Sequence, residues 1–278
     1  MTVKWYAPLS HLLQMKARLP LAAAAVSGVV AYRQRRARQA VERFAAAALE
    51  TLLNAIEAND AQTGHHVRRV AAYALVIADA AGLDERRRRA IERVALFHDV
   101  GKIHEELFDI VHDDSQLTPT ERREIATHPR RGAEVLAPLA AFYPELPDGV
   151  LSHHERWDGR GYPRHLRGDQ IPLAARIVSI ADTFDALTHN RRYRRGKGLD
   201  EAIQVIAAGR GKQFDPQLID LVLMPPVLDQ LARTHVEQHR PVGDGRRDGQ
   251  RERVPDVSFR WRSRSLRPRA VDSAKNAD

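Results

Sequence analysis

The chain has 278 residues, of which 43% are hydrophobic and only 6% aromatic, and it contains no cysteine. This length suits one main domain with extensions, and the lack of cysteine excludes disulfides and thiolate metal ligands, so any metal must be held by His, Asp or Glu. The formal net charge of +8 would attract anionic nucleotides, membranes or nucleic acid, unless it is only a solvated arginine-rich surface.

Residues 1–45 differ from the rest and predict an N-terminal helical extension. Residues 19–32 form an apolar run of 14 residues, short of the roughly 20 that cross a bilayer. A basic, helix-forming run follows at residues 33–38, where a signal peptide would need a polar cleavage region. The segment is a weak membrane anchor, an interfacial helix, or a helix that docks on a partner or a second copy. Membrane association is the less favoured of these.

Residues 46–226 carry a helical pattern and predict an all-α domain. One helical repeat runs from Ile91 to His98 at i, i+3, i+4 and i+7, which places His98 on a buried helix face. Asp84 is the expected N-cap of that helix, and Pro172 is expected to open another helix at a position that tolerates proline. No convincing alternating strand pattern occurs.

Residues 227–278 predict a C-terminal extension, mostly disordered and rich in arginine. The piece FRWRSR, at residues 259–264, interleaves aromatic side chains with arginines. Such a piece could stack on bases or lie on a membrane surface, but we favour the disordered tail.

Five clusters of His and Asp lie at the ends or buried faces of the expected helices. Burying so many ionisable groups is costly unless a bound cation compensates. Imidazoles and carboxylates can hold two divalent ions roughly 3.5–4 Å apart, and a water between such ions becomes a nucleophile near neutral pH. The pattern therefore predicts phosphodiester hydrolysis, with these candidate metal ligands: His66, His98, Asp99, His128, His153, His154 and Asp182.

Two motifs resemble those of a known family. HDVGK, at residues 98–102, matches the HD-x-GK signature of the HD superfamily, and HHERWDGRGYP, at residues 153–163, matches the HHE-xx-DG-x-GYP signature of the HD-GYP family in every defined position. The similarity runs from about residue 49 to residue 223. The resemblance implies a bacterial helical bundle that hydrolyses cyclic di-GMP to the linear dinucleotide pGpG or to GMP, using two or three metals, commonly iron or manganese.

The resemblance also assigns roles to the candidate ligands. Asp99 would bridge two ions, and three residues would complete the shell of the first ion: His66, His98 and Asp182. The second ion would bind His128 with one or both of His153 and His154, and that division stays open.

Further residues would face the substrate. Lys102 would approach the scissile phosphate as a fixed positive charge, which makes it a catalytic residue together with Asp99. The alternative is that Lys102 pairs with a carboxylate. Arg191 and Arg194 match a basic pair that contacts the phosphates of the nucleotide. GKQFDP, at residues 211–216, resembles the end of the family domain and is expected to be structural.

Two departures from the family pattern refine these expectations. Gln62 stands where three-metal members carry Glu, and because a neutral amide is a poor ligand for a hard cation, we expect two ions. In the same family pattern the ligand His stands two residues after a Gly, which is Gly64 here, so His66 and not His65 is the expected ligand. Residues 103–118 replace the usual continuation of the HD motif with an acidic, His-containing stretch. In the family this segment lies near the mouth of the site, so its change opens the question of substrate.

Alternatives to cyclic di-GMP hydrolysis therefore remain. One is an HD-type phosphohydrolase that acts on another nucleotide or phosphoester. Another is a protein-interaction module whose GYP surface, residues 158–163, contacts a diguanylate cyclase. A homodimer through the N-terminal helix also stays open, and nucleic acid is not an expected partner. We expect a cytoplasmic protein, with membrane association through residues 1–45 as the alternative.

Overall fold

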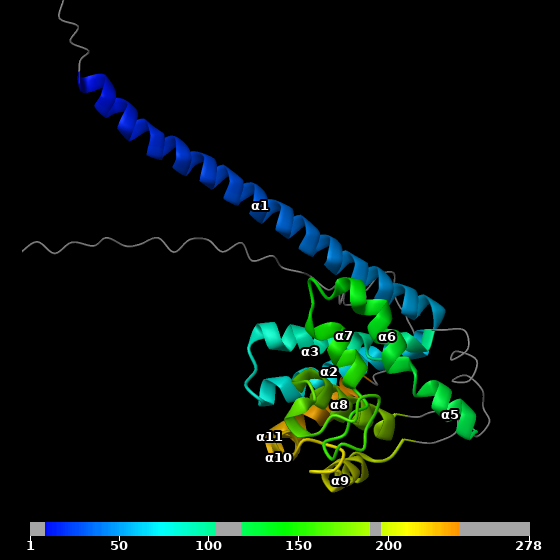
Figure 1. Cartoon of the computed structure of the whole chain (residues 1–278). Helices are drawn as coiled ribbons and strands as arrows, with labels where there is room; N and C mark the ends of the chain where they lie inside the picture. The colour runs from blue at the N-terminus through cyan, green and yellow to red at the C-terminus, as the bar shows by residue number, and fades with distance from the viewer. Residues whose placement is uncertain (1–8, 104–117, 190–195, 239–278) are drawn as a thin grey trace, which may run out of the picture. The chain divides into compact units, whose positions relative to one another are not determined.

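A computed structural model describes residues 9–103, 118–189 and 196–238 (Figure 1). Side chains are described from residue 30 onward. Every element in these ranges is a helix, which confirms the all-α prediction. The arginine-rich tail lies outside the described residues. In chain order the elements are α1 (Leu9–Asn59), α2 (Ala61–Ala80), α3 (Glu85–Phe97), the 3-10 turn η1 (Val100–Ile103), α5 (Pro119–Ile125), α6 (His128–Leu136), η2 (Ala137–Leu139), α7 (Glu145–Ser152), η3 (Gly168–Gln170), α8 (Leu173–Thr188), α9 (Leu199–Ala208), α10 (Pro216–Val222) and α11 (Pro225–Gln238).

Helix α2 forms the centre of the bundle and packs against α1, α3, α8 and α11. Its buried face carries Tyr73 and Ile77, and the Tyr73 ring meets the Phe184 ring of α8 edge-on, with centroids 4.8 Å apart. Burying a side chain of this size stabilises the fold by about 1.5–3 kcal/mol. The core therefore holds α2 and α8 in a fixed register, and both helices carry candidate ligands.

Local signals set the helix ends as the sequence predicts. The Asp84 carboxylate accepts the backbone N–H of Arg87 at 2.8 Å and caps α3. Asp60 caps α2 in the same way. Pro172 directly precedes the first residue of α8, which confirms a helix opening there.

Helix α1 runs without a break through residue 45, the predicted end of the N-terminal extension. Residues 30–44 are exposed, whereas Ala45, Leu49, Leu53 and Ile56 are buried in the core. No helix in the described part of the chain combines the length and apolar character that crossing a membrane requires.

Helix α11 lies beyond residue 226, the predicted end of the domain, and packs against α2. Leu231 is buried, and His235 Nδ1 lies 3.1 Å from the Tyr73 hydroxyl. The boundaries at residues 45 and 226 stay predictions, since helical packing continues across both.

Candidate metal centre

The His98-Asp99 pair follows the last residue of α3, at the point where the chain turns into η1. Gly101 makes this turn fit, because a Cβ at that position would lie 2.1 Å from the carbonyl oxygen of His128 and 2.6 Å from the amide nitrogen of Gly132. Only glycine lets η1 approach α6 so closely. Gly101 of the HD-x-GK motif therefore allows Asp99 to lie next to His128.

A first cluster joins three helices. His66 of α2, His98 after α3 and Asp182 of α8 each offer a ligand atom, and these atoms lie within 4.8 Å of one another. Asp182 Oδ1 is 3.4 Å from His66 Nε2 and 3.9 Å from His98 Nε2.

A second cluster consists of histidines only. His128 opens α6, and His153 and His154 directly follow α7; their ligand atoms also lie within 4.8 Å of one another. The sequence left open how His153 and His154 divide between two ions. The structure brings both to His128.

Asp99 lies between the two clusters. Its Oδ2 is 3.6 Å from His66 Nε2 and 3.4 Å from His98 Nε2. Its Oδ1 is 3.3 Å from His128 Nε2 and 4.0 Å from His153 Nε2. Each carboxylate oxygen therefore faces a different cluster, which is the arrangement of a bridging carboxylate.

Hydrogen bonds on the far side of the rings orient the imidazoles. In three histidines Nδ1–H donates at 2.6–2.7 Å to the carbonyl of the residue three positions earlier: His98 to Ala95, His128 to Ile125, and His153 to Val150. His66 differs, because its Nδ1–H donates to Asp185 Oδ2 at 2.7 Å. In His98, His128 and His153 this leaves an Nε2 lone pair that points into the clusters. His66 Nε2 also points there, toward Asp182 and Asp99.

These lone pairs lack partners within the described chain. The Nε2 atoms of His128 and His153 lie 3.1 Å apart, but since both rings already donate through Nδ1, no hydrogen bond can join them. His98 Nε2 and Asp99 Oδ1 are buried without a hydrogen-bond partner among the described residues. An unsatisfied buried group costs about 1–3 kcal/mol. Cations would satisfy all of these atoms, so the two His/Asp clusters are consistent with a dinuclear metal site.

The protonation states suit cations. Burial lowers the pKa of His98, lowers that of His153 well below its usual range with help from neighbouring imidazoles, and lowers that of His154 to about 3. Burial alone would raise the pKa of Asp99, but Lys102 and the surrounding imidazoles hold it well below its usual range. Metal ligation needs this combination of neutral imidazole and ionised carboxylate.

His66 is the exception among the histidines. Burial lowers its pKa, but hydrogen bonds to Asp182, Asp185 and Asp99 outweigh burial and hold the pKa well above the usual value. In the metal-free chain His66 therefore carries the positive charge that a cation would otherwise supply.

Lys102 Nζ donates to Asp99 Oδ2 at 2.7 Å, and its side chain is 29% exposed. This contact is the carboxylate pairing that the sequence left as the alternative, and a role toward phosphate stays a prediction. Arg191, Arg194 and residues 104–117 lie outside the described residues. His65 is exposed, as expected of the histidine that does not point into the site.

The GYP motif folds back on itself to support His154. The buried carboxylate of Glu155 accepts the backbone N–H groups of Arg164 at 2.6 Å and Leu166 at 3.0 Å. A Cβ on Gly161 would lie 2.3 Å from the amide nitrogen of Arg156, so glycine is needed there. The fold-back stacks the Tyr162 ring on the His154 ring, with centroids 4.9 Å apart.

The stretch at residues 211–216 closes this loop. The carbonyls of Lys212 and Gln213 accept the backbone N–H groups of Asp158 at 2.8 Å and Trp157 at 3.1 Å. These contacts agree with the structural role expected of GKQFDP.

Sequence reasoning missed three buried residues that support the centre: Arg69, Glu155 and Asp185. Asp185 offered a signal, because it follows Asp182 by three residues and so shares its helix face. Glu155 stood inside the GYP motif without an assigned role. Arg69 had no signal of its own, because its partner is 116 residues away.

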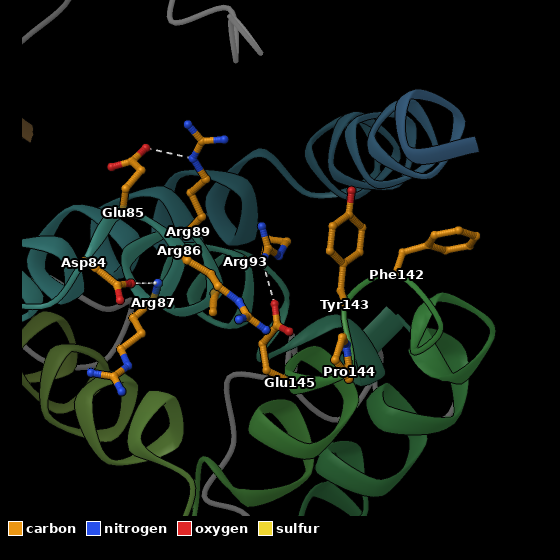
Figure 2. A pocket seen from close by; sticks show the side chains of 11 residues that line it. Asp84, Glu85, Arg86, Arg87, Arg89, Arg93, Phe142, Tyr143, Pro144 and Glu145 are labelled. Atoms are coloured by element: carbon orange, nitrogen blue, oxygen red, sulfur yellow. Dashed lines mark hydrogen bonds and ion pairs between the residues drawn. The ribbon is translucent and has the colours of Figure 1, made fainter. Parts of the chain in front are cut away.

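A cavity of about 730 Å³ lies elsewhere, between the first turns of α3 and the segment that leads into α7 (Figure 2). None of the candidate ligands lines it among the described residues. Arg93 of its wall forms an ion pair with Glu145 and stacks on the Tyr143 ring, with the guanidinium carbon 4.4 Å from the centroid. This cavity is therefore distinct from the metal centre.

Comparisons with known proteins agree with the geometry. The family model described as HD domain matches residues 50–218. The chain is 39% identical over 177 residues to the cyclic di-GMP phosphodiesterase response regulator RpfG of Xanthomonas campestris pv. campestris, covering 63% of this chain and 46% of that protein. It is 37% identical over 174 residues to the 3'3'-cGAMP-specific phosphodiesterase 2 of Vibrio cholerae, covering 62% and 33%. With a cyclic di-GMP phosphodiesterase of Thermotoga maritima the identity is 35% over 187 residues, covering 66% and 50%. The chain thus spans half or less of the length of these relatives.

A solved structure shares the fold. The HD domain of the Listeria monocytogenes phosphodiesterase PgpH, in complex with cyclic-di-AMP, aligns with a TM-score of 0.50 at 21% identity, covering 72% of this chain and 99% of that domain.

Proposed function

The chain belongs to the HD domain family and is related to the HD-GYP cyclic di-GMP and cGAMP phosphodiesterases, and from this premise we propose that it hydrolyses a cyclic dinucleotide. Cyclic di-GMP is the substrate we put first, with pGpG, GMP or both as the product. Two divalent ions, iron or manganese, would be its cofactors.

One observation carries the proposal: Asp99 directs one oxygen to each of two ligand clusters, and His98 Nε2 and Asp99 Oδ1 are buried there without a hydrogen-bond partner in the described chain. Phosphodiester hydrolysis uses such paired sites, and a structural metal site would not need two adjacent ions that share a carboxylate. The sequence motifs and the related phosphodiesterases support the same chemistry.

When bound, two divalent ions supply an acidic water as nucleophile and positive charge opposite the phosphoryl oxygens. The residues of the chain would hold the ions and orient the substrate. Asp99 would hold the two sites at a fixed separation, and the ring hydrogen bonds of His98, His128 and His153 would keep their Nε2 atoms aimed inward. Lys102, 29% exposed beside Asp99, would present its ammonium group to the phosphate.

Cyclic GMP-AMP is the second candidate substrate, because the relative that is 37% identical is named for it and the relative that is 39% identical is named for cyclic di-GMP. Identities this close do not separate the two substrates. A diguanylate cyclase at the GYP surface and a second copy of the chain stay predictions as partners.

The test is a direct assay. Protein loaded anaerobically with Fe(II) or Mn(II) is incubated with cyclic di-GMP and, in parallel, with cyclic GMP-AMP, and the products are resolved by chromatography. We expect linear dinucleotide or mononucleotide from at least one of them. A preparation with two bound ions that cleaves neither substrate would refute the proposal.

A further inference from the structure

A buried ion pair lies behind His66, on the side away from the metal clusters. Arg69 Nε donates to Asp185 Oδ1 at 2.6 Å, and Arg69 Nη2 donates to Asp185 Oδ2 at 3.0 Å. Asp185 Oδ2 also accepts from His66 Nδ1 at 2.7 Å. The Arg69 and Asp185 side chains are only 7% and 2% exposed, so solvent does not share these contacts.

Stability alone does not explain this pair. A buried ion pair often contributes no more than well-packed apolar residues would, because both charges must leave water. The contact does, however, fix three things about His66: the tautomer, the ring orientation and the negative charge behind it. Each of these governs how well Nε2 binds a cation.

His66 needs such a partner because of its place in the fold. The other three oriented histidines directly follow α3 or α7 or open α6, where they reach a carbonyl three residues earlier. His66 lies within α2, where the preceding carbonyls already accept the backbone hydrogen bonds of the helix. A side chain from α8 therefore takes the place of the missing carbonyl acceptor.

The Arg69–Asp185 ion pair supports the first cluster and not the second. Asp185 follows Asp182 by one turn of α8, so a single helix supplies both a candidate ligand and the support of another. Arg69 follows His66 by three residues on α2. The α2–α8 contact thus serves the first cluster, while the second cluster relies on α6, α7 and the GYP loop.

We propose that Asp185, held by Arg69, is a positioning residue that makes His66 a metal ligand and so sets the affinity of the first ion independently of the second. The inference rests on the metal centre of the proposed function.

Metal binding tests it without any turnover. Metal-free protein is titrated with Mn(II) or Co(II) by calorimetry, and bound metal is counted by elemental analysis. Asp185→Ala removes the acceptor, Asp185→Asn keeps a neutral acceptor, and Arg69→Gln keeps the carboxylate but breaks the ion pair. We expect the affinity for one ion to fall about 100-fold in Asp185→Ala and about tenfold in Asp185→Asn, with less than tenfold in Arg69→Gln.

The second ion serves as the folding control within each variant. A positioning role predicts that Asp185→Ala retains tight binding of one ion, and that adding His154→Ala to it removes the remaining ion. Arg93→Gln is the control, because it breaks an ion pair of another mostly buried arginine outside the centre and should leave both ions in place.

Three results would overturn the inference. Asp185→Ala could bind both ions as tightly as the wild-type chain, it could lose both together, as an unfolded chain would, or Arg93→Gln could show the same selective loss. A wild-type chain that binds no divalent ion overturns this inference and the proposed function together. A wild-type chain that binds two ions but cleaves no cyclic dinucleotide refutes only the proposed function.

Discussion

The candidate metal centre and the wall of the cavity between α3 and the segment that leads into α7 both bring charged side chains close together. They differ in whether each charge has a partner of opposite sign within the chain. Around the cavity, Arg93 meets Glu145 and Arg89 meets Glu85, so cation and anion pair within the chain (Figure 2). In the metal centre, imidazole lone pairs and a carboxylate oxygen face one another. The comparison teaches that unmatched acceptors, and not charge density or cavity volume, distinguish the candidate site for cations.

The largest test of this contrast removes the residue that both clusters share. Asp99→Ala should lose both metal ions, because the carboxylate that would bridge them is gone. Turnover of the cyclic dinucleotide should then fall by at least about three orders of magnitude. Elemental analysis and the chromatographic assay measure this. His65→Ala is the control, since His65 is exposed and should leave both properties unchanged. Full activity of Asp99→Ala would mean that the site lies elsewhere.

The pH dependence of the metal-free chain probes the same crowding. The pKa of His154 is lowered to about 3 in the fold, against a usual value of 6.5, so the unfolded chain binds the extra proton between these values. The destabilisation from this group is therefore absent above pH 6.5 and grows as pH falls toward 3, by about 1.4 kcal/mol per pH unit at most. Urea unfolding in EDTA at pH 5 and pH 7 should show this loss of stability in the wild-type chain and a smaller one in His154→Gln. Equal slopes in both proteins would contradict the assignment.

Glu155 tests whether the GYP loop completes the second cluster. In Glu155→Gln the amide would place a donor against a backbone N–H that the carboxylate now accepts, and we expect a loss of about 1–3 kcal/mol in the free energy of unfolding. Because this loop stacks Tyr162 on His154, the affinity for the second ion should fall as well. Chemical denaturation and metal titration measure the two effects. If the affinity for the second ion did not change, the loop would have no role in the metal centre.

The smallest effect is expected at the cavity. Arg86 is exposed and forms no ion pair within the described part of the chain. Arg86→Ala should change the free energy of unfolding by less than about 0.5 kcal/mol and should leave metal content and turnover at the wild-type level. A marked loss of activity in this variant would show that the cavity has a role in turnover.

Much of the site could be predicted from the sequence because its information is local. The spacing of apolar residues placed His98 on a buried face, and the position of Gly64 selected His66 over the exposed His65. Contiguous motifs identified the seven candidate ligands, and the structure gathers all seven into two neighbouring clusters. Helix caps such as Asp84 were equally local.

What the sequence determined by itself was therefore the helical class, the types of candidate ligand and the residues proposed to carry them, since each depends on neighbours within a few turns. Only the tertiary structure decided which ligands meet. It brought His153 and His154 together at His128, turned one oxygen of Asp99 to each cluster, and placed Asp185 behind His66 from 119 residues away. Helical periodicity sets the direction of a side chain on its own helix, but the distance between two helices depends on how their faces pack, and that packing has no signature in the linear sequence.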